Sequence, residues 1–283
     1  MPASVNLKPW EIPKWFDTGG APEQYRYRFL VEGDSWMDRS AVLQGSLPDF
    51  LGYLLDKRHK SSMFINLAMF GDELRRMGDA VAGDFSHWVQ DWSYDAVLLS
   101  GGGNDFIDAA RDPDPGQGIL LDLRGQPAPA TGLECINQVA VDKLVKDYLD
   151  PNFRLLYDAM RQGKSRGDKP TIPIFLNQYD VPKARNAPAL AGSKAWLFEA
   201  YMKNGTPPAL WDEVTKEIFS ALGKALDGWT QAPFVDVHVV PTLGTLIPAS
   251  DTADNDWVNE IHPNPSGWKK LAAVWWATMA SSL

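Results

Sequence analysis

Four short stretches of the sequence carry groups that could do chemistry, and their order along the chain is informative. They contain Ser35 directly after Gly-Asp, a lone Gly71, Asn104 in the run GGGND, and His262 in the run NEIHPNPSG. A hydroxyl, a carboxamide and an imidazole are groups that acyl transfer uses, as a nucleophile, a donor to the developing oxyanion and a base. Acyl transfer therefore requires that the fold bring these stretches together.

Each stretch also has a simpler interpretation when it is taken alone. A serine after Gly-Asp at the end of a strand is commonly a turn residue or a helix cap. GGGND could be a loose turn or a loop whose N–H groups cradle phosphate, although it contains no Lys or Arg to assist an anion. His59, His87 and His238 lack the spacing of metal ligands, so no metal site is predicted.

The elements that must position these residues follow an alternating pattern. Short apolar runs rich in β-formers alternate with longer segments of helical period, which is typical of βαβ units. We predict strands at 28–33, 64–69, 95–100, 171–180 and 234–240. We predict helices at 46–58 with Ser46 as N-cap, 72–88, 137–162, 209–229, and after residue 266 with Ser266 as N-cap. The predicted fold is an α/β fold, a three-layer α/β/α sandwich with a central, mostly parallel five-stranded sheet.

The strand assignments place the candidate residues at one edge of that sheet. Strand 28–33 ends just before Ser35, strand 64–69 just before Gly71, and strand 95–100 just before the GGGND run. In an open parallel sheet, ligands bind at the carboxyl ends of the strands, where the loops gather. The residues of the four stretches are therefore predicted to meet in one site.

Three segments fall outside this pattern within what we predict to be a single domain, residues 1–283. Residues 1–24 form an irregular arm punctuated by prolines. Insertions at about 108–133 and 183–206 are long enough to suggest a lid or a substrate-binding flap. At helical spacing in the last helix, Trp268, Trp275 and Trp276 are expected to be core residues.

Composition excludes several classes of partner. The chain has 283 residues, is 45% hydrophobic and 22% charged, and carries a formal charge of −9, so neither nucleic acid nor membrane insertion is expected. Cys135 is the single cysteine, which excludes an internal disulfide. A reducing, cytoplasmic location is expected because no leader pattern is present at the start of the sequence. The sequence makes no prediction of the oligomeric state.

Taken together, GDS near the N-terminus, the lone glycine, GxND and the late histidine resemble the blocks of the SGNH (GDSL) hydrolase family. The resemblance runs from about residue 28 to the C-terminus and implies a flavodoxin-like SGNH hydrolase fold. It implies a serine hydrolase that cleaves carboxylic esters, of the short-acyl esterase, lipase or carbohydrate acetylesterase type. A small-molecule ester is then the substrate, and no metal or organic cofactor is needed.

Residue roles follow from the same resemblance. Ser35 is expected to be the nucleophile and His262 the base. The oxyanion hole is expected to consist of the backbone N–H groups of Ser35 and Gly71 and the side-chain amide of Asn104. Trp36, directly after the nucleophile, is expected to wall the acyl pocket.

The last block departs from the family pattern DxxH, because Asn259 stands where the aspartate is expected. An asparagine can accept a hydrogen bond from the imidazole but contributes no negative charge. Asp256, Glu260, Asp254 or a backbone carbonyl could orient His262 instead. We favour Asn259 in the aspartate's position, with Asp256 as the carboxylate that compensates.

Two alternatives of other classes remain open at this point. The departure at Asn259 could mark a catalytically impaired module that binds an acyl or glycan ligand on the same fold. The glycine-rich run could instead serve a phosphate or nucleotide binder, which would have no reactive serine.

Overall fold

A computed structural model describes residues 2–39, 45–80, 84–167, 169–190, 192–250 and 255–283. Its central sheet has six strands in the order β1-β3-β2-β5-β7-β8, and every neighbouring pair is parallel. The strands are β1 (Val5–Leu7), β2 (Tyr27–Gly33), β3 (Ser62–Asn66), β5 (Ala96–Ser100), β7 (Ile174–Asn177) and β8 (Val237–Val240). The α/β/α architecture is confirmed, but the predicted number of five strands is one too low.

The additional strand comes from the arm that the sequence analysis described as irregular. β1 pairs with β3 at the edge of the sheet, with Leu7 opposite Ile65. The arm then forms α1 (Ile12–Asp17), with 3-10 turns at Pro9–Glu11 and Pro22–Gln24. A strand of three residues is too short to show the alternation on which strand prediction depends, so β1 was missed.

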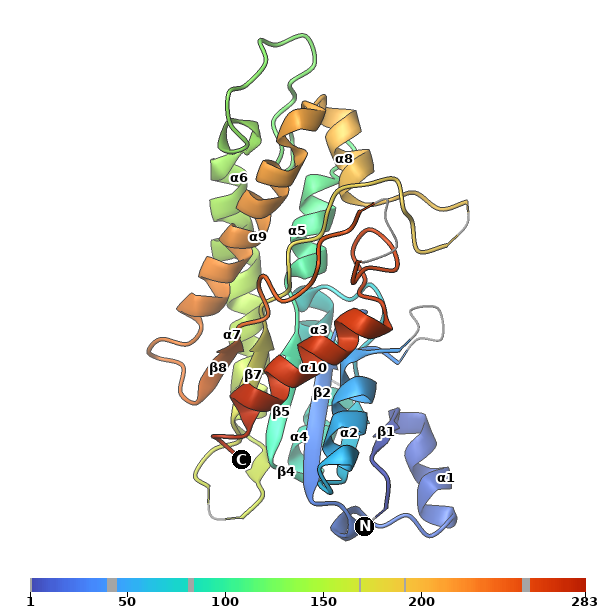
Figure 1. Cartoon of the computed structure of the whole chain (residues 1–283). Coiled ribbons are helices and arrows are strands. Elements are labelled where there is room, and N and C mark those ends of the chain that lie inside the picture. Colours follow the sequence, from blue (N-terminus) through green and yellow to red (C-terminus); the bar gives the residue numbers. More distant parts are fainter. Residues whose placement is uncertain (1, 40–44, 81–83, 168, 191, 251–254) are drawn as a thin grey trace.

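Helices cover both faces of the sheet, as Figure 1 shows. α2 (Leu47–Lys57) and α10 (Pro265–Met279) pack together on one face. α3 (Leu74–Ala80), α4 (Asp84–Asp91) and α7 (Asp150–Met160) lie on the other face. The predicted core tryptophans of α10 are buried, Trp268 and Trp275 completely.

The rest of the chain rises beyond the carboxyl ends of the strands (Figure 1). It includes α5 (Gly103–Ala110), α6 (Gln138–Lys143), α8 (Leu197–Asn204) and α9 (Trp211–Gly228). A π-helical segment, Leu144–Leu149, joins α6 to α7, and 3-10 turns form at Leu133–Cys135 and Pro208–Leu210. This upper layer stands over the edge where the candidate residues lie. Outside it, β4 (Ser93–Tyr94) and β6 (Lys164–Ser165) make a separate parallel pair, and β4 directly precedes β5 at the amino end of the sheet.

Several predicted boundaries differ from those observed. Of the helix predicted at 72–88, the structure describes α3 (Leu74–Ala80) and α4 (Asp84–Asp91), and residues 81–83 lie outside the described part of the chain. The insertion at 183–206 contains α8, and the helix predicted at 137–162 contains the π-helical segment. The π-helical segment between α6 and α7 does not follow the 3.6-residue period, so the hydrophobic pattern could not predict it.

The two predicted helix caps have different outcomes. Ser46 precedes α2, and its N–H donates to the Asp49 carboxylate at 3.1 Å, as a capping residue should. The cap of α10 is Asn264 rather than Ser266, because the Asn264 carboxamide oxygen accepts the N–H of Ser266 at 2.9 Å and of Gly267 at 3.1 Å. Pro265 then occupies the first helical position, where its missing N–H costs nothing.

Among the described residues, no helix combines the length and the apolar character that crossing a membrane would need.

Candidate active site

The Gly-Asp pair before Ser35 turns the chain sharply at the end of β2. At Gly33, φ is +149°, and a Cβ there would lie 2.6 Å from the Ser100 carbonyl oxygen, so only glycine lets β2 and β5 pass so closely. The Asp34 carboxylate accepts the Trp36 N–H at 3.0 Å, which closes a local turn around Ser35. Ser35 is thereby held at the carboxyl edge of the sheet with only 4% of its surface exposed.

The other side of the Asp34 carboxylate is bound from β5 and from the end of β7. Tyr179 donates its hydroxyl to Asp34 at 2.5 Å, and Ser100 donates at 3.0 Å. Burial raises the pKa of Asp34 to about 6, against the opposing effect of these hydrogen bonds. Tyr179 itself adopts φ +62°, an unusual conformation for a tyrosine, so the surrounding structure holds it there. These hydrogen bonds fix Asp34 and thereby the turn that carries Ser35.

Ser35, His262 and Asn259 form a continuous hydrogen-bonded chain. Ser35 Oγ lies 2.8 Å from His262 Nε2, and His262 Nδ1 lies 2.9 Å from Asn259 Oδ1. All three residues are buried, with His262 at 0% exposure. The structure therefore brings together two residues that are 227 positions apart in the sequence.

Asn259 determines which nitrogen of the imidazole carries the proton. Its Oδ1 also accepts the backbone N–H groups of Ile261 at 3.1 Å and His262 at 2.9 Å. Two backbone donors require an oxygen at this place, so the carboxamide cannot turn its NH₂ toward the ring. Nδ1 therefore carries the proton, and the lone pair of Nε2 faces the Ser35 hydroxyl.

The surroundings of His262 favour its neutral form. Phe70 stacks on the imidazole at 6.0 Å between ring centroids, and Trp196 presents its edge at 5.5 Å. Burial lowers the pKa of His262 to about 3. The imidazole is therefore unprotonated at neutral pH, which is the state that a general base needs.

The two described carboxylates considered as alternatives to Asn259 are used elsewhere. Asp256 accepts from Lys270 Nζ at 2.5 Å and from the Ile247 N–H at 2.7 Å. Burial would raise its pKa, but these partners together hold it below the usual value. The expectation that Asp256 compensates for the missing charge is therefore not supported. Asp254 lies outside the described residues.

Glu260 anchors the 183–206 insertion instead of orienting the imidazole. Its carboxylate accepts the N–H groups of Leu197 at 3.0 Å, Phe198 at 2.7 Å and Arg185 at 3.0 Å, together with that of Trp196. These groups include the first turn of α8, where a negative charge is favourable. Because Trp196 contacts His262, the insertion is fixed against the loop that carries His262.

Gly71 lies in the turn after β3, next to Asn104 in the first turn of α5. Met69 to Asp72 form a turn in which the Asp72 N–H donates to the Met69 carbonyl at 3.2 Å, and Gly71 has φ +76° at its third position. Asn104 donates one amide hydrogen to the Asp72 carbonyl at 2.9 Å, which leaves its second amide hydrogen for another acceptor. A Cβ at Gly71 would meet open space, so no neighbouring atom excludes a side chain there. Glycine is favoured because of the positive φ of the turn.

A small pocket of about 20 Å³ opens beside Ser35. Ser35, Trp36 and Asn104 line it together with Tyr179 and Ile107. The indole N–H of Trp36 donates to the Ile261 carbonyl at 3.1 Å, which holds this wall against the loop of His262.

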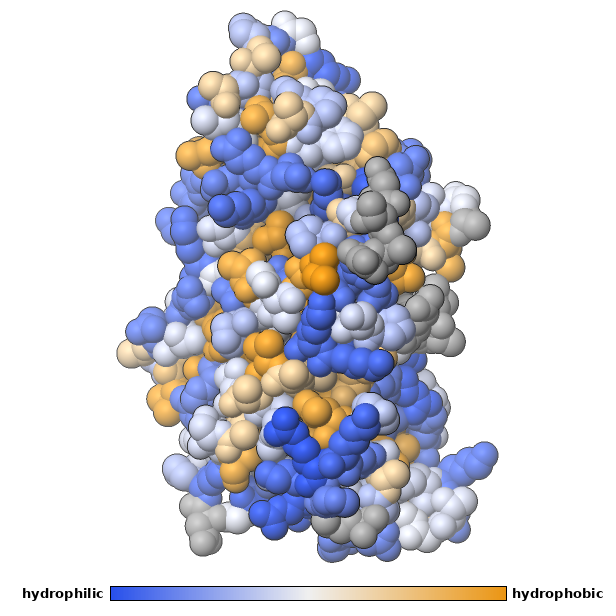
Figure 2. Space-filling model, viewed as in Figure 1, coloured by the Kyte–Doolittle hydropathy of each residue, from blue (hydrophilic) through white to orange (hydrophobic). Residues whose placement is uncertain are grey.

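A larger groove of about 560 Å³ adjoins this pocket. Both spaces are lined by Asp180, Pro182 and Phe219, so they share a boundary at the end of β7 and on α9. Further along, the groove runs between α9 and the segment that follows β8, where Leu243, Leu246 and Pro248 line it. Figure 2 shows apolar and polar residues interspersed on this face.

The glycine-rich run does not form a phosphate cradle. A Cβ at Gly103 would lie 2.9 Å from the Tyr179 ring, so this glycine serves close packing. Asp105 stands in the first turn of α5, buried, and accepts the Leu74 N–H at 3.1 Å. A carboxylate in that place opposes anion binding. Within the described part of the chain, no cluster of three or more His, Cys, Asp or Glu side chains could hold a metal ion.

Sequence reasoning missed Tyr179, Phe70 and Trp196, which contact this constellation. Tyr179 lies two residues after β7, and the rule that ligands lie at strand ends could have identified it. Trp196 lies in the insertion, where no sequence signal indicates its contact with His262.

Comparison with known proteins gives a likeness in structure alone. Neither the protein-family models nor the curated proteins contain a match to this sequence. A lipase from a goat rumen metagenome is similar over 89% of this chain and 97% of its own, with a TM-score of 0.55 and 13% identity. A Clostridium thermocellum family 3 carbohydrate esterase is similar over 90% of this chain and 96% of its own, with a TM-score of 0.49 and 15% identity. A GDSL-like lipase from Bacteroides thetaiotaomicron is similar over 97% of this chain and 98% of its own, with a TM-score of 0.47 and 10% identity.

At these identities the likeness shows the fold alone. The chain shares the three-layer α/β/α fold of the goat rumen metagenome lipase.

Proposed function

We propose that this protein is a serine hydrolase that cleaves carboxylic esters through an acyl-enzyme on Ser35. The observation that carries the proposal is the chain of hydrogen bonds from Ser35 Oγ to His262 at 2.8 Å and from His262 to Asn259 at 2.9 Å. A serine and a neutral imidazole in this geometry match the arrangement of an activated nucleophile and its base.

In this mechanism, Ser35 Oγ attacks the ester carbonyl carbon while His262 Nε2 takes the hydroxyl proton. The carbonyl oxygen becomes an oxyanion, and the backbone N–H groups of Ser35 and Gly71 and the Asn104 amide donate to it. Collapse of the tetrahedral intermediate expels the alkoxide, which receives the proton from His262. Water then attacks the acyl-enzyme with His262 again as base, and the carboxylic acid leaves.

The imidazolium formed in each half-reaction has no carboxylate partner at Nδ1. Asn259 supplies orientation and the correct tautomer through its carboxamide oxygen. Because its carboxamide is neutral, Asn259 does not stabilise the positive charge of the imidazolium as a carboxylate would. We therefore expect slower turnover than from an aspartate-bearing site of the same geometry.

The size of the pocket supports short acyl groups. The pocket of about 20 Å³ beside Ser35 leaves room for a small acyl group such as acetyl, whereas the adjoining groove of about 560 Å³ can hold a larger alcohol portion. Lipases and carbohydrate esterases are among the proteins with this fold. We propose a short-acyl ester of a bulky alcohol as the substrate.

The test is hydrolysis of p-nitrophenyl esters from acetyl to palmitoyl by the intact protein and by Ser35→Ala. We expect turnover with acetyl and butyryl esters, a steep decline toward palmitoyl, and loss of turnover in the variant. A fluorophosphonate should label the intact protein and not the variant. Absence of both turnover and labelling would refute the hydrolase proposal.

That negative result would favour a second candidate, a module that binds an acyl or glycan ligand without turnover. The lack of a charged partner for His262 is the observation that favours it. Saturable binding of a short-acyl ester without product formation, measured by calorimetry, would identify such a module.

A further inference from the structure

The arm that precedes β2 places a buried lysine next to the candidate site. β1 pairs Leu7 with Ile65, so the following residue, Lys8, arrives beside Asn66 at the carboxyl end of β3. Lys8 is only 5% exposed. Burying an ammonium group costs free energy unless close partners compensate for its lost hydration, so its contacts are informative.

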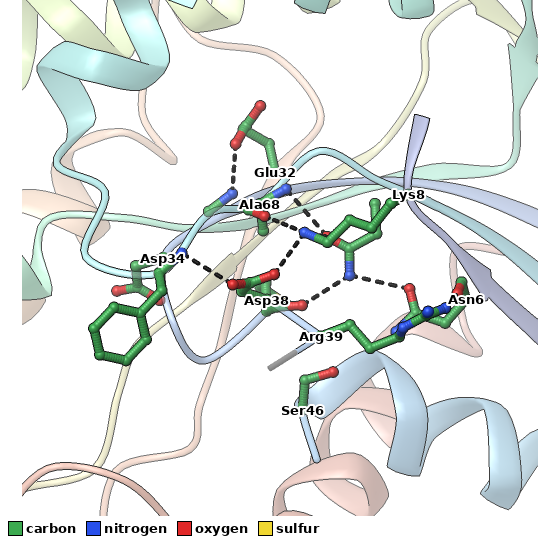
Figure 3. Close-up of polar contacts among 12 residues, drawn as sticks. Asn6, Lys8, Glu32, Asp34, Asp38, Arg39, Ser46 and Ala68 are labelled. Atoms are coloured by element: carbon green, nitrogen blue, oxygen red, sulfur yellow. Dashed lines mark hydrogen bonds and ion pairs between the residues drawn. The ribbon is translucent and has the colours of Figure 1, made fainter. Parts of the chain in front are cut away.

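Lys8 Nζ contacts groups from two separate segments, as Figure 3 shows. It forms an ion pair with the Asp38 carboxylate at 2.6 Å, three residues after the nucleophile. It also donates to the Ala68 carbonyl and, at 3.4 Å, to Asn66 Oδ1. The lysine thus connects the loop that contains Ser35 to the segment that leads from β3 to Gly71.

The Asp38 carboxylate continues this connection to the turn that contains Gly71. Its second oxygen accepts the Phe70 N–H at 3.0 Å (Figure 3). The same turn is tied to β2 by the Met69 N–H, which donates to the Gly33 carbonyl at 2.9 Å. Since Phe70 also stacks on His262, the position of this turn depends on Asp38 on one side and on the site on the other.

The turn geometry explains how this arrangement serves Gly71. The turn's own hydrogen bond uses the N–H of Asp72, and Asp38 uses the N–H of Phe70. The N–H of Gly71 lies between these two and takes part in neither bond. A turn held at both neighbouring positions keeps the intervening N–H in a fixed direction.

Glu32, another buried acid near Lys8, does not compete for the ammonium charge. Burial raises the pKa of Glu32 to about 8, so it is protonated at neutral pH. Asp38 is therefore the anion that Lys8 neutralises, at 2.6 Å.

We infer that Lys8 is a positioning residue for the oxyanion hole, acting through Asp38 and the Ala68 carbonyl on the Gly71 turn. The inference rests on the proposed ester hydrolysis and assigns a role to the N-terminal arm. Lys8 touches no substrate in this role. Without its charge, the partly buried Asp38 carboxylate loses its counter-ion, and the turn loses the support that directs the Gly71 N–H.

The expected effect on rate is smaller than loss of an oxyanion donor. Removing one donor costs about 10² to 10³ in kcat, and a displaced donor retains part of its effect. We therefore expect Lys8→Met to lower kcat by about 10 to 10² with KM changed less than about twofold. Methionine keeps an unbranched apolar side chain in the buried site, so the change chiefly removes the charge.

The experiment compares Lys8→Met, Asp38→Asn and the double variant with the intact protein on p-nitrophenyl acetate. Inhibition by phenylboronic acid, whose adduct with Ser35 mimics the tetrahedral intermediate, is measured alongside. We expect the inhibition constant to rise in parallel with the fall in kcat/KM. The double variant should lose no more than the worse single variant, because both residues act on one turn.

Arg39→Gln is the matched control. Like Lys8, Arg39 joins the N-terminal arm to the loop after Ser35, through Glu11 at 2.6 Å, but on the surface, with 41% of its side chain exposed. This variant should keep kcat and the inhibition constant within about twofold of the intact protein.

Thermal melting separates folding from positioning. If Lys8→Met does not fold, Asp38→Asn carries the test, since it retains a polar side chain facing Phe70. Turnover by the intact protein with an unchanged kcat and inhibition constant in a folded Lys8→Met or Asp38→Asn variant would overturn the positioning role alone. Absence of turnover and of labelling at Ser35 in the intact protein would overturn the hydrolase proposal and this inference with it.

Discussion

Replacing Asn259 with aspartate would supply the one charge that the site lacks. Asn259 Oδ1 already accepts three N–H groups, from Ile261, from the His262 backbone and from the imidazole. A carboxylate would accept the same three donors, and hydrogen bonds of this kind stabilise its ionised form. The substitution therefore changes charge while it preserves the orientation and tautomer of the ring.

The size of the effect follows from the distance between the two groups. The imidazole nitrogen lies 2.9 Å from Oδ1, which places the centres of the two charges about 4 Å apart. At an effective dielectric constant of about 20, their attraction is about 4 kcal/mol, equivalent to about 3 pKa units. Burial lowers the pKa of His262 to about 3 in the intact protein, so Asn259→Asp should raise it to about 6.

The consequence for pH dependence has a definite sign. kcat/KM requires neutral His262, so in the intact protein it should hold from neutral pH down to about pH 3. In Asn259→Asp, the acid limb should move up to about pH 6. At pH 8, His262 is neutral in both proteins. There, kcat of Asn259→Asp should exceed that of the intact protein by about 10- to 10³-fold, because the carboxylate stabilises the imidazolium that forms in the transition state.

The assay is the pH profile of p-nitrophenyl acetate hydrolysis by both proteins, with Asn259→Ala as control. The alanine variant lacks the acceptor that orients the ring and should lose kcat without gaining an acid limb near pH 6. An unchanged acid limb in a folded Asn259→Asp protein would refute the assignment of His262 as the base paired with this residue.

Two further predictions concern Asn104 and Glu260. Asn104→Leu should lower kcat by about 10² to 10³ with little change in KM, because it removes an oxyanion donor; steady-state kinetics measure this, and an unchanged kcat would remove Asn104 from the oxyanion hole. Glu260→Gln should destabilise the fold by about 1.5 to 3 kcal/mol, because a charged acceptor of several backbone N–H groups becomes neutral. Urea denaturation measures the loss, and hydrogen exchange should show faster exchange at residues 196–198; exchange that stays slow there would contradict the anchoring role of Glu260.

The sequence alone was sufficient to predict the order and type of the main elements. Alternation of apolar strands with amphipathic helices depends on periods of 2 and 3.6 residues, and these are local properties of the chain. The same strand ends located Ser35 and the loop of Asn104, because the carboxyl edge of a parallel sheet is set by strand direction. Gly33 and Gly71 were also visible in the sequence, although the reason for Gly71 lies in its turn conformation.

Tertiary structure decided how the histidine is oriented. Asp256, Glu260 and Asn259 lie within four residues of one another, and although the block pattern favours Asn259, the sequence does not exclude the two carboxylates. The choice depends on Lys270 binding Asp256 and on the backbone of α8 binding Glu260. Both partners are distant in sequence or lie in an insertion without periodicity.

The role of the N-terminal arm shows the same division. Its residues carry no periodic signal, and a lysine in an irregular segment is ordinarily a solvated surface residue. Only the pairing of β1 with β3 carries Lys8 to the buried edge beside Asp38. The sequence by itself determined which chemical groups stand at the strand ends, because that depends on local patterns. The tertiary structure alone decided which of their neighbours support them, because those contacts join segments whose spacing along the chain carries no information about distance in space.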